Sequence, residues 1–532
     1  MSVSRDVSHV NLIWAVIYTT MFAYVNSMGI YGMDAYKVVV EADVSPGMYK
    51  FNVVGLPDPA VSESRERVRS AALNSRLYFP TGKIVVNLAP ADMKKTGPVY
   101  DLPLLTAILA ATNQLDYTLL EKSVFVGELS LNGELHGIDG VLPMILKAQE
   151  EGFESIYIPY DNAAEGVAVE GIDVYPVDTV NSLIDHLKGE KKLRSVKNSS
   201  YEVKTAGQTL DFSDVKGQTM AKRSIEVAAS GGHNILMIGA PGSGKSMLAK
   251  RIPTILPDMT YEESIETTKI YSIAGMMEPG VPLIRTRPFR APHHTMSPAS
   301  LSGGGAIPHP GELSLAHNGV LFLDELPEFQ RNALEILRQP MENGQITISR
   351  VMGSVTYPCS VMVVAAMNPC PCGFYGNAKR SCVCSDKAVA KYMSKLSGPL
   401  LDRIDIQIEV PSVEFETMSS TSRGESSAVI RERVNRARKI QQERFAGAGI
   451  SCNAFMTEPM VQQYCTMTGE AKNTLKNAFE ILGLSARGHD KILKIARTIA
   501  DMEQSETICE AHISEAVCYR SLDKKYWGGF RP

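Results

Sequence analysis

Residues 239–246 read Gly-Ala-Pro-Gly-Ser-Gly-Lys-Ser, the phosphate-binding loop pattern G-x-x-x-x-G-K-S/T. The apolar run 234–238 predicts a buried strand before it, and the run 247–251 predicts the start of a helix after it. Loop N–H groups placed there cradle phosphates at the positive end of the helix. This context disfavours a chance glycine-rich turn. The sequence therefore predicts a nucleoside triphosphate site formed by Gly239, Ala240, Pro241, Gly242, Ser243, Gly244, Lys245 and Ser246.

Within that site, Lys245 is expected to reach the β- and γ-phosphates and Ser246 to bind Mg²⁺. The apolar run 319–323 ends in Asp324 and Glu325, which is the Walker B pattern of a strand tipped by carboxylates. Asp324 is expected to hold Mg²⁺, and Glu325 to polarise the attacking water.

Three more polar residues complete the predicted catalytic set. The apolar run 361–367 ends at Asn368, the sensor 1 position of AAA+ ATPases. Arg403 suits a finger into a neighbouring subunit's site; the alternative is an ordinary helix-end salt bridge with Asp402 or Asp405. Arg487 opens a helix and suits sensor 2, a cis arginine that touches phosphate. Upstream, residues 215–218 resemble the segment that packs on the adenine ring in this superfamily.

The length, net charge and apolar content of the chain limit the kinds of protein it can be. Its 532 residues predict about three domains. A net charge of −4 gives no overall basic field, so nucleic-acid contacts must come from local patches. The apolar stretch 12–25 is too short to span a bilayer and lacks a clean cleavage site. We therefore expect a cytoplasmic protein without a membrane partner, whose natural start is Met21.

The predicted organisation follows the local patterns. Residues 1–20 are expected to be a non-native or disordered extension. Residues 21–190 alternate strands and helices, and a polar, lysine-rich linker at 191–210 follows. Residues 211–410 form the α/β region with the phosphate loop, and 411–532 are helical. The clearest expected strands are 38–42, 83–87 and 156–159, and the clearest helices 62–73, 102–112, 491–502 and 508–520.

A series of motifs in order resembles a known family. The segments are 27–34, 54–58, 87–92, 290–295, 301–305, 308–312, 315–319 and 335–342. They are similar to magnesium-chelatase-like AAA+ ATPases, and specifically to the ComM (YifB) family. The resemblance runs from residue 21 to about 523.

That resemblance implies an α/β P-loop AAA+ core with a C-terminal helical lid. It implies an ATP- and Mg²⁺-dependent homo-hexamer, a DNA helicase that promotes branch migration in homologous recombination during natural transformation. Its expected partners are single-stranded or branched DNA and recombination proteins. Two alternatives remain: a chelatase motor subunit, and a MoxR-like ATPase that remodels a protein partner. The N-terminal region argues against the chelatase role, because chelatase ATPase subunits are expected to lack it.

The N-terminal region carries a second resemblance. Residues 127–134 and 140–143 resemble the α+β Lon protease domain of the ribosomal-S5-like fold. Lon uses a Ser–Lys dyad, but Val99 and Leu142 stand at the matching positions, and neither side chain can act as or activate a nucleophile. We therefore expect a scaffold for oligomer or DNA contacts, by analogy with the similar inactive domain of the RadA ATPase.

Four cysteines form two C-x-C pairs, at Cys370, Cys372, Cys382 and Cys384. Thiolates converging from one short loop suit tetrahedral Zn²⁺, with Lys379 and Arg380 offsetting some of the charge. The alternative is four unlinked, reduced cysteines.

Two segments are candidates for DNA contact in a ring. Residues 345–357 predict a strand–turn–strand hairpin with Arg350 near its tip. The insert 285–305 carries Arg290, His293 and His294. Basic side chains on loops bind the phosphate backbone without sequence preference. Alternatively, the histidines shape the insert and the arginines pair with carboxylates.

Overall fold

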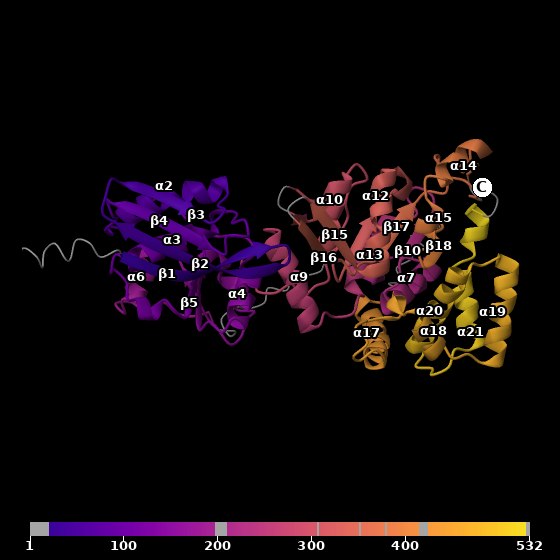
Figure 1. The fold of residues 1–532 in the computed structure, drawn as a ribbon. Coiled ribbons are helices and arrows are strands. Elements are labelled where there is room, and N and C mark those ends of the chain that lie inside the picture. The colour runs from indigo at the N-terminus through magenta and orange to yellow at the C-terminus, as the bar shows by residue number, and fades with distance from the viewer. Residues whose placement is uncertain are drawn as a thin grey trace, which may run out of the picture. The chain divides into compact units, whose positions relative to one another are not determined.

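The computed structural model describes residues 21–196, 210–305, 308–350, 353–377, 380–413 and 424–527. The chain divides into two compact units, one comprising Met1–Thr205 with Thr268–Ile284 and the other Ala206–Thr267 with Arg285–Pro532 (Figure 1). The predicted extension at 1–20 and positions 197–209 of the predicted linker lie outside the described residues.

The first unit is built on a mixed, seven-stranded sheet in the order β3-β4-β2-β1-β5-β8-β9. Strand β2 pairs antiparallel with β1 and β4, and the other neighbours are parallel. The expected strands at 38–42, 83–87 and 156–159 are confirmed as parts of β2, β4 and β8. The bounds are β1 Met21–Tyr31, β2 Asp34–Ser45, β3 Lys50–Val54, β4 Lys83–Ala89, β5 Ser123–Phe125, β8 Ser155–Pro159 and β9 Asp173–Val177.

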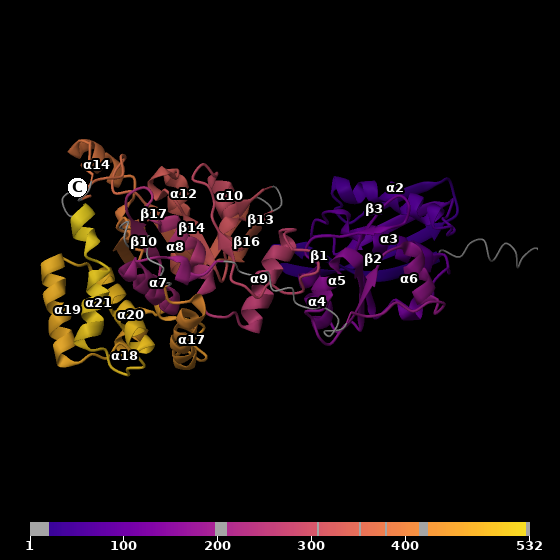
Figure 2. The ribbon, with the colours of Figure 1, turned by 180° about the vertical axis from the view of Figure 1, so that it is seen from behind.

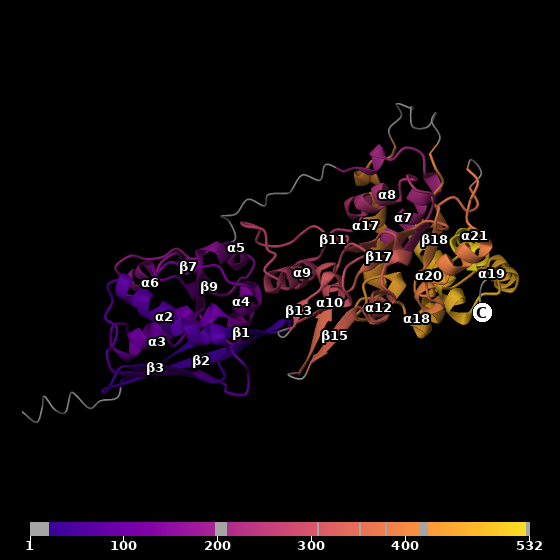
Figure 3. The ribbon, with the colours of Figure 1, turned by 90° about the horizontal axis from the view of Figure 1, so that it is seen from above.

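Helices α3 (Asp101–Ala111) and α4 (Val141–Glu150) pack against β1 and β2 (Figure 3). Every residue of α3 is buried, which explains its largely apolar sequence. Its one carboxylate, on Asp101, is fully buried and forms an ion pair of 2.6 Å with Arg67 of α2 (Pro59–Asn74). A buried carboxylate is tolerated when it is paired in this way. The expected helices at 62–73 and 102–112 are thus confirmed.

A segment from the middle of the chain also belongs to the first unit. Helix α9 (Tyr261–Ile273) leads into it, and its Ser272 hydroxyl donates to Glu165 Oε2 at 2.5 Å. The N–H of Gly140 donates to the Ser272 carbonyl at 2.9 Å. Burial raises the pKa of Glu165. These bonds explain why 268–284 groups with the first unit, although the sequence predicts one region over 211–410.

The second unit contains a five-stranded sheet in the order β11-β14-β17-β10-β18, and all of its pairs are parallel. Strands β10, β14 and β17 are buried at every residue. Strands buried on both faces read as continuous apolar runs, which is why the sequence indicated them. Their bounds are β10 Ile235–Ile238, β11 Phe289–Arg290, β14 Val320–Leu323, β17 Met362–Met367 and β18 Ile406–Glu409.

Helices cover this sheet and continue to the end of the described chain. Helix α7 (Thr219–Gly231) contacts β18, and α8 (Lys245–Arg251) contacts β17, with both helices labelled in Figure 2. Helix α20 (Ala486–Met502) packs against α7 and against other C-terminal helices. The expected terminal helices are confirmed in α20 and α21. The other C-terminal helices are α17 Ser427–Arg444, α18 Glu458–Tyr464, α19 Gly469–Leu482 and α21 Glu510–Cys518. None of the helices in the described ranges has the length and apolarity to cross a membrane.

Candidate nucleotide site and cysteine cluster

The phosphate loop joins the carboxyl end of β10 to the N-terminus of α8. Gly242 and Gly244 adopt φ angles of +78° and +94°, a region that residues with a side chain rarely enter. The predicted strand, loop and helix are therefore confirmed. Ligands of open parallel sheets bind outside the carboxyl ends of the strands, and the tips of β14 and β17 reach the same edge as β10.

Lys245 is turned into this loop. Its Nζ donates to the carbonyls of Gly239 at 2.7 Å and Ala240 at 3.0 Å, and lies 3.3 Å from Asn368 Oδ1. Burial lowers the pKa of Lys245, and the charge of Asp324 opposes that shift. The structure thus brings together the ammonium group and the predicted sensor residue at the tip of β17.

Ser246 and Asp324 meet from opposite sides of the site. The Ser246 hydroxyl donates to Asp324 Oδ2 at 2.7 Å. Neighbouring ligands of an octahedral Mg²⁺ ion, each about 2.05 Å from the metal, lie about 2.9 Å apart. Hard oxygen donors at nearly this spacing fit a magnesium ion, so the residues present suit the predicted cofactor.

Glu325 has an unexpected neighbour. Its backbone is left-handed, with φ +53°, and its side chain is 54% exposed. His294 Nδ1 lies 3.5 Å from Glu325 Oε2. Sequence reasoning grouped His294 with the DNA contacts and missed this proximity. The feature that could have indicated it is the short strand β11, which precedes His294. Because β11 lies parallel to β14, the segments that follow the two strands leave the sheet at the same edge.

The two predicted arginines are not bonded to the phosphate loop in the described ranges. Arg403 donates to the Pro399 carbonyl at 2.6 Å and forms an ion pair with Glu342, leaving its side chain 11% exposed. Its partner is therefore neither Asp402 nor Asp405. Arg487 is exposed near the start of α20.

Gln218 is a loop contact that the sequence indicated only through its segment. It adopts φ +56°, and its Nε2 donates to the carbonyls of Ser243 at 3.2 Å and Pro411 at 2.6 Å. The predicted adenine segment at 215–218 is thus attached directly to the phosphate loop.

The predicted hairpin exists as antiparallel strands β15 (Gln345–Arg350) and β16 (Gly353–Pro358). Arg350 pairs with Gly353 in the register, and its side chain lies outside the described part of the chain. Arg290 forms a bidentate pair with Glu312, with both bonds at 2.7 Å. His293 is exposed and lies 2.8 Å from the Thr295 hydroxyl. The alternative to DNA contact was that the arginines pair with carboxylates, and Glu312 is such a partner for Arg290.

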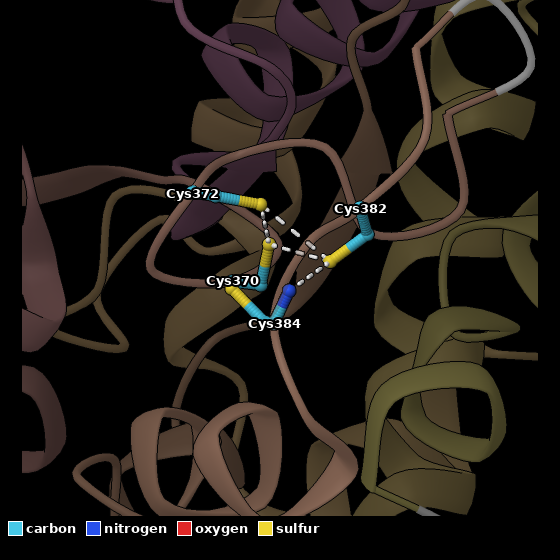
Figure 4. Close-up of side chains that lie close together, drawn as sticks. All are labelled: Cys370, Cys372, Cys382 and Cys384. Carbon is cyan, nitrogen blue, oxygen red and sulfur yellow. Dashed lines mark hydrogen bonds between the residues drawn. The ribbon is translucent and has the colours of Figure 1, made fainter.

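The four cysteines of the predicted metal site lie together, with all their Sγ atoms within 4.8 Å of one another. Figure 4 shows the four cysteine side chains gathered in one place. Sγ of Cys370 lies 3.4 Å from that of Cys372 and 3.6 Å from that of Cys382, and the Cys372–Cys382 separation is 3.5 Å. A tetrahedral zinc ion with Zn–S bonds of about 2.3 Å has sulfurs about 3.8 Å apart. The donor set and its spacing therefore fit zinc.

Arg380, one of the two basic residues expected to offset the thiolate charge, stacks 4.2 Å from the centre of the Phe374 ring. The other, Lys379, lies outside the described residues. N–H groups of Val383 and Phe374 lower the pKa of Cys372 to about 6, whereas the pKa values of Cys382 and Cys384 are raised.

A phosphate loop and a Walker B carboxylate at the edge of a parallel sheet define a P-loop ATPase. If the five strands of this sheet are numbered in chain order, they lie side by side in the order 5-1-4-3-2, from β18 to β11. Family models support this class. "Magnesium chelatase, subunit ChlI" matches 211–418, "Subunit ChlI of Mg-chelatase" matches 40–162, and "Magnesium chelatase, subunit ChlI C-terminal" matches 424–520.

Similar proteins narrow the assignment. Competence protein ComM of Haemophilus influenzae is 44% identical over 94% of this chain and 97% of its own length. The YifB protein of Escherichia coli is 44% identical over 93% of this chain and 96% of its own. The chain therefore belongs to the ComM/YifB family of magnesium-chelatase-like AAA+ proteins, and this membership implies ATPase activity.

Chelatase subunits match much less of the chain. The magnesium-chelatase 67 kDa subunit of Chlorobaculum parvum is 28% identical over 30% of this chain and 23% of its own length. However, the family model at 40–162 has a chelatase description, so the presence of this region does not by itself argue against a chelatase role. The ComM and YifB matches cover far more of this chain than the chelatase match, and this difference in coverage separates the two classes better.

Proposed function

We propose that this chain is a hexameric AAA+ motor that uses ATP to move DNA strands, promoting branch migration during recombination of incoming DNA. The observation that carries the proposal is the convergence of Lys245, Ser246, Asp324 and Asn368 in a chain that matches ComM over nearly its whole length.

In the proposed reaction, Lys245 and the loop N–H groups bind the phosphates, and Ser246 and Asp324 hold the metal. Magnesium, when bound, neutralises charge on the phosphates. Glu325 orients the attacking water and accepts its proton. Arg403 acts on the site of a neighbouring subunit, and Arg487 acts from the C-terminal helices, which serve as the lid.

For DNA, we propose that the β15–β16 hairpin and the insert 285–305 face single-stranded or branched DNA in the ring. The hairpin forms a two-stranded sheet of its own, and Arg350 is the last residue of β15, paired with Gly353. Arg290 is the weaker candidate, because Glu312 already neutralises it. Arg350→Ala should lower DNA affinity and flatten its salt dependence; an unchanged salt slope would remove the hairpin from the interface.

We propose that residues 21–190 form a Lon-like domain that acts as a scaffold. At the positions of the Lon dyad, Val99 and Leu142 are 8% and 0% exposed, and apolar side chains there supply no nucleophile or base. Incubation with casein and ATP tests this assignment, since ATP-stimulated degradation would overturn it.

We propose that Cys370, Cys372, Cys382 and Cys384 bind zinc. The support is the set of four sulfurs near tetrahedral spacing. Mass-spectrometric metal analysis of protein purified without chelators should find about one zinc per chain. Protein that folds and hydrolyses ATP without near-stoichiometric zinc would refute the site.

A second candidate is a chelatase-type or MoxR-like ATPase that remodels a protein partner, which the family-model descriptions favour. ATPase rates with branched DNA, single-stranded DNA and no DNA separate the candidates. Stimulation by branched DNA supports the motor, whereas equal rates in all three samples favour protein remodelling.

The decisive experiment is a branch-migration assay on a synthetic four-way junction. Wild type is expected to convert the junction only with ATP and Mg²⁺, and Lys245→Ala is expected to be inactive although it still oligomerises. A wild-type protein that hydrolyses ATP but leaves every junction unmoved would exclude this function.

A further inference from the structure

We infer that the metal-binding loop holds the phosphate loop in place, so that zinc binding and nucleotide binding are coupled. This inference rests on the zinc and ATP sites proposed above. It adds a specific mechanical link between them, through Gly373 and Pro241.

The first contact is a close backbone approach. Gly373 follows the ligand Cys372 directly and has φ +82°. A Cβ atom added at Gly373 would lie 2.4 Å from Cδ and 2.8 Å from Cγ of Pro241. The backbone of the cysteine loop therefore rests on the proline ring of the phosphate loop, and only glycine leaves room for that contact.

The second contact comes from the other end of the same turn. Asn368, two residues before the buried Cys370, has its Oδ1 3.3 Å from Lys245 Nζ. The Gly373 N–H donates to the Cys370 carbonyl at 3.0 Å and closes the turn. A short, hydrogen-bonded segment thus touches the phosphate loop at both ends and carries two of the four thiols.

A bound metal would tie this segment to Cys382 and Cys384, which lie further along the chain. Cys382 and Cys384 are separated from Cys370 and Cys372 by a loop. Among the described residues, the contacts between the two arms are weak ones to sulfur: Cys382 Sγ lies 3.6 Å from Cys370 Sγ and 3.5 Å from Cys372 Sγ, and the Val383 N–H bonds to Cys372. Release of the arms restores the conformational freedom of the loop. Nucleotide binding must then order Pro241 and Asn368 again, which weakens the affinity.

Gly373→Ala tests the contact while keeping all four thiols. Affinity for a fluorescent ATP analogue and zinc content are measured on the same sample. We expect wild-type zinc content and at least about tenfold weaker nucleotide binding, equivalent to about 1.4 kcal/mol. The matched control is Gly376→Ala, because Gly376 also has a positive φ, +72°, but has no atom within 4 Å of an added Cβ. It should bind nucleotide like wild type.

Cys382→Ser tests the metal. It should lose zinc and bind the same analogue at least about tenfold more weakly, whereas Cys518→Ser, an exposed cysteine outside the cluster, should change neither quantity. Circular dichroism checks that each variant is folded. Zinc-loaded Gly373→Ala with wild-type nucleotide affinity overturns the coupling and leaves both proposed sites intact. Wild type that binds nucleotide but no zinc overturns the metal site itself, and the coupling with it.

Discussion

His294 and Glu325 follow two neighbouring parallel strands, β11 and β14, and approach each other beyond the strand ends, with His294 Nδ1 3.5 Å from Glu325 Oε2. His294 also packs edge-on against Phe329, which limits the movement of its ring. Glu325 has no other ion-pair partner within the described ranges. We propose that His294 positions Glu325, the carboxylate proposed above to orient the attacking water.

His294→Ala should therefore reduce ATP turnover by about tenfold, because a misplaced general base loses part of the 10²–10⁴-fold that such catalysis contributes. Affinity for ATP should be unchanged, since no hydrogen bond or ion pair in the described ranges joins His294 to the phosphate loop. Steady-state kinetics and nucleotide titration measure the two effects. His309→Ala, an exposed histidine of the same unit, is the control, and a His294→Ala enzyme with wild-type kcat would contradict the role.

Glu325→Gln should bind ATP with nearly wild-type affinity and lose at least about 10²-fold in turnover. The amide has the same shape as the carboxylate but cannot accept a proton from water. Single-turnover hydrolysis measures the chemical step separately from product release. Retained turnover would assign the base to another residue. Glu328→Gln is a suitable control, because Glu328 lies nearby but pairs with Lys395 at 2.9 Å.

The features predictable from sequence were those encoded in short, contiguous patterns. Buried parallel strands read as apolar runs, so the tips carrying Asp324 and Asn368 could be located and expected to meet. The pairing of Arg403 with Glu342 depends on how two helices pack, and that of His294 with Glu325 on where two loops pass after leaving the sheet. No local periodicity specifies such contacts.

The same limit explains the segment 268–284. Its helix continues the pattern of the ATPase region, and nothing in its composition indicates that Ser272 would bond to Glu165. The contact of Gly373 with Pro241 was equally hidden. In that case the cysteine spacing indicated a metal, but not that the loop rests on the nucleotide site.

Arg403→Ala should bind ATP but hydrolyse it at least about 10³-fold more slowly, the lower end of the effect of removing an arginine finger. If Arg403 acts on a neighbouring subunit, adding this variant to wild type should lower the specific activity of the mixture below the average of its components. ATPase assays of mixed samples measure this effect. Arg338→Ala, which removes an exposed pair with Glu335, should leave activity unchanged. Simple averaging in the mixtures would place Arg403 outside the neighbouring site.

The last prediction concerns stability. Asp405 is buried, with Lys491 Nζ at 2.6 Å and His233 Nδ1 at 3.4 Å. Burial alone would raise the pKa of Asp405, but Lys491 and His233 overcome it and hold this pKa well below its usual value. Asp405→Asn leaves Lys491 buried without a partner, which should cost about 3–5 kcal/mol at pH 7.

The pH dependence follows from the sign of that shift. A carboxyl with a depressed folded pKa contributes stability above its unfolded value, near 3.9, and this contribution fades as the pH falls below it. The difference between wild type and Asp405→Asn should therefore shrink below about pH 4, where the carboxyl becomes protonated in the unfolded chain. Urea unfolding at several pH values measures it, with Asp402→Asn as the control. A difference that does not shrink between about pH 4 and 2 would mean that Asp405 is not the charged partner of Lys491.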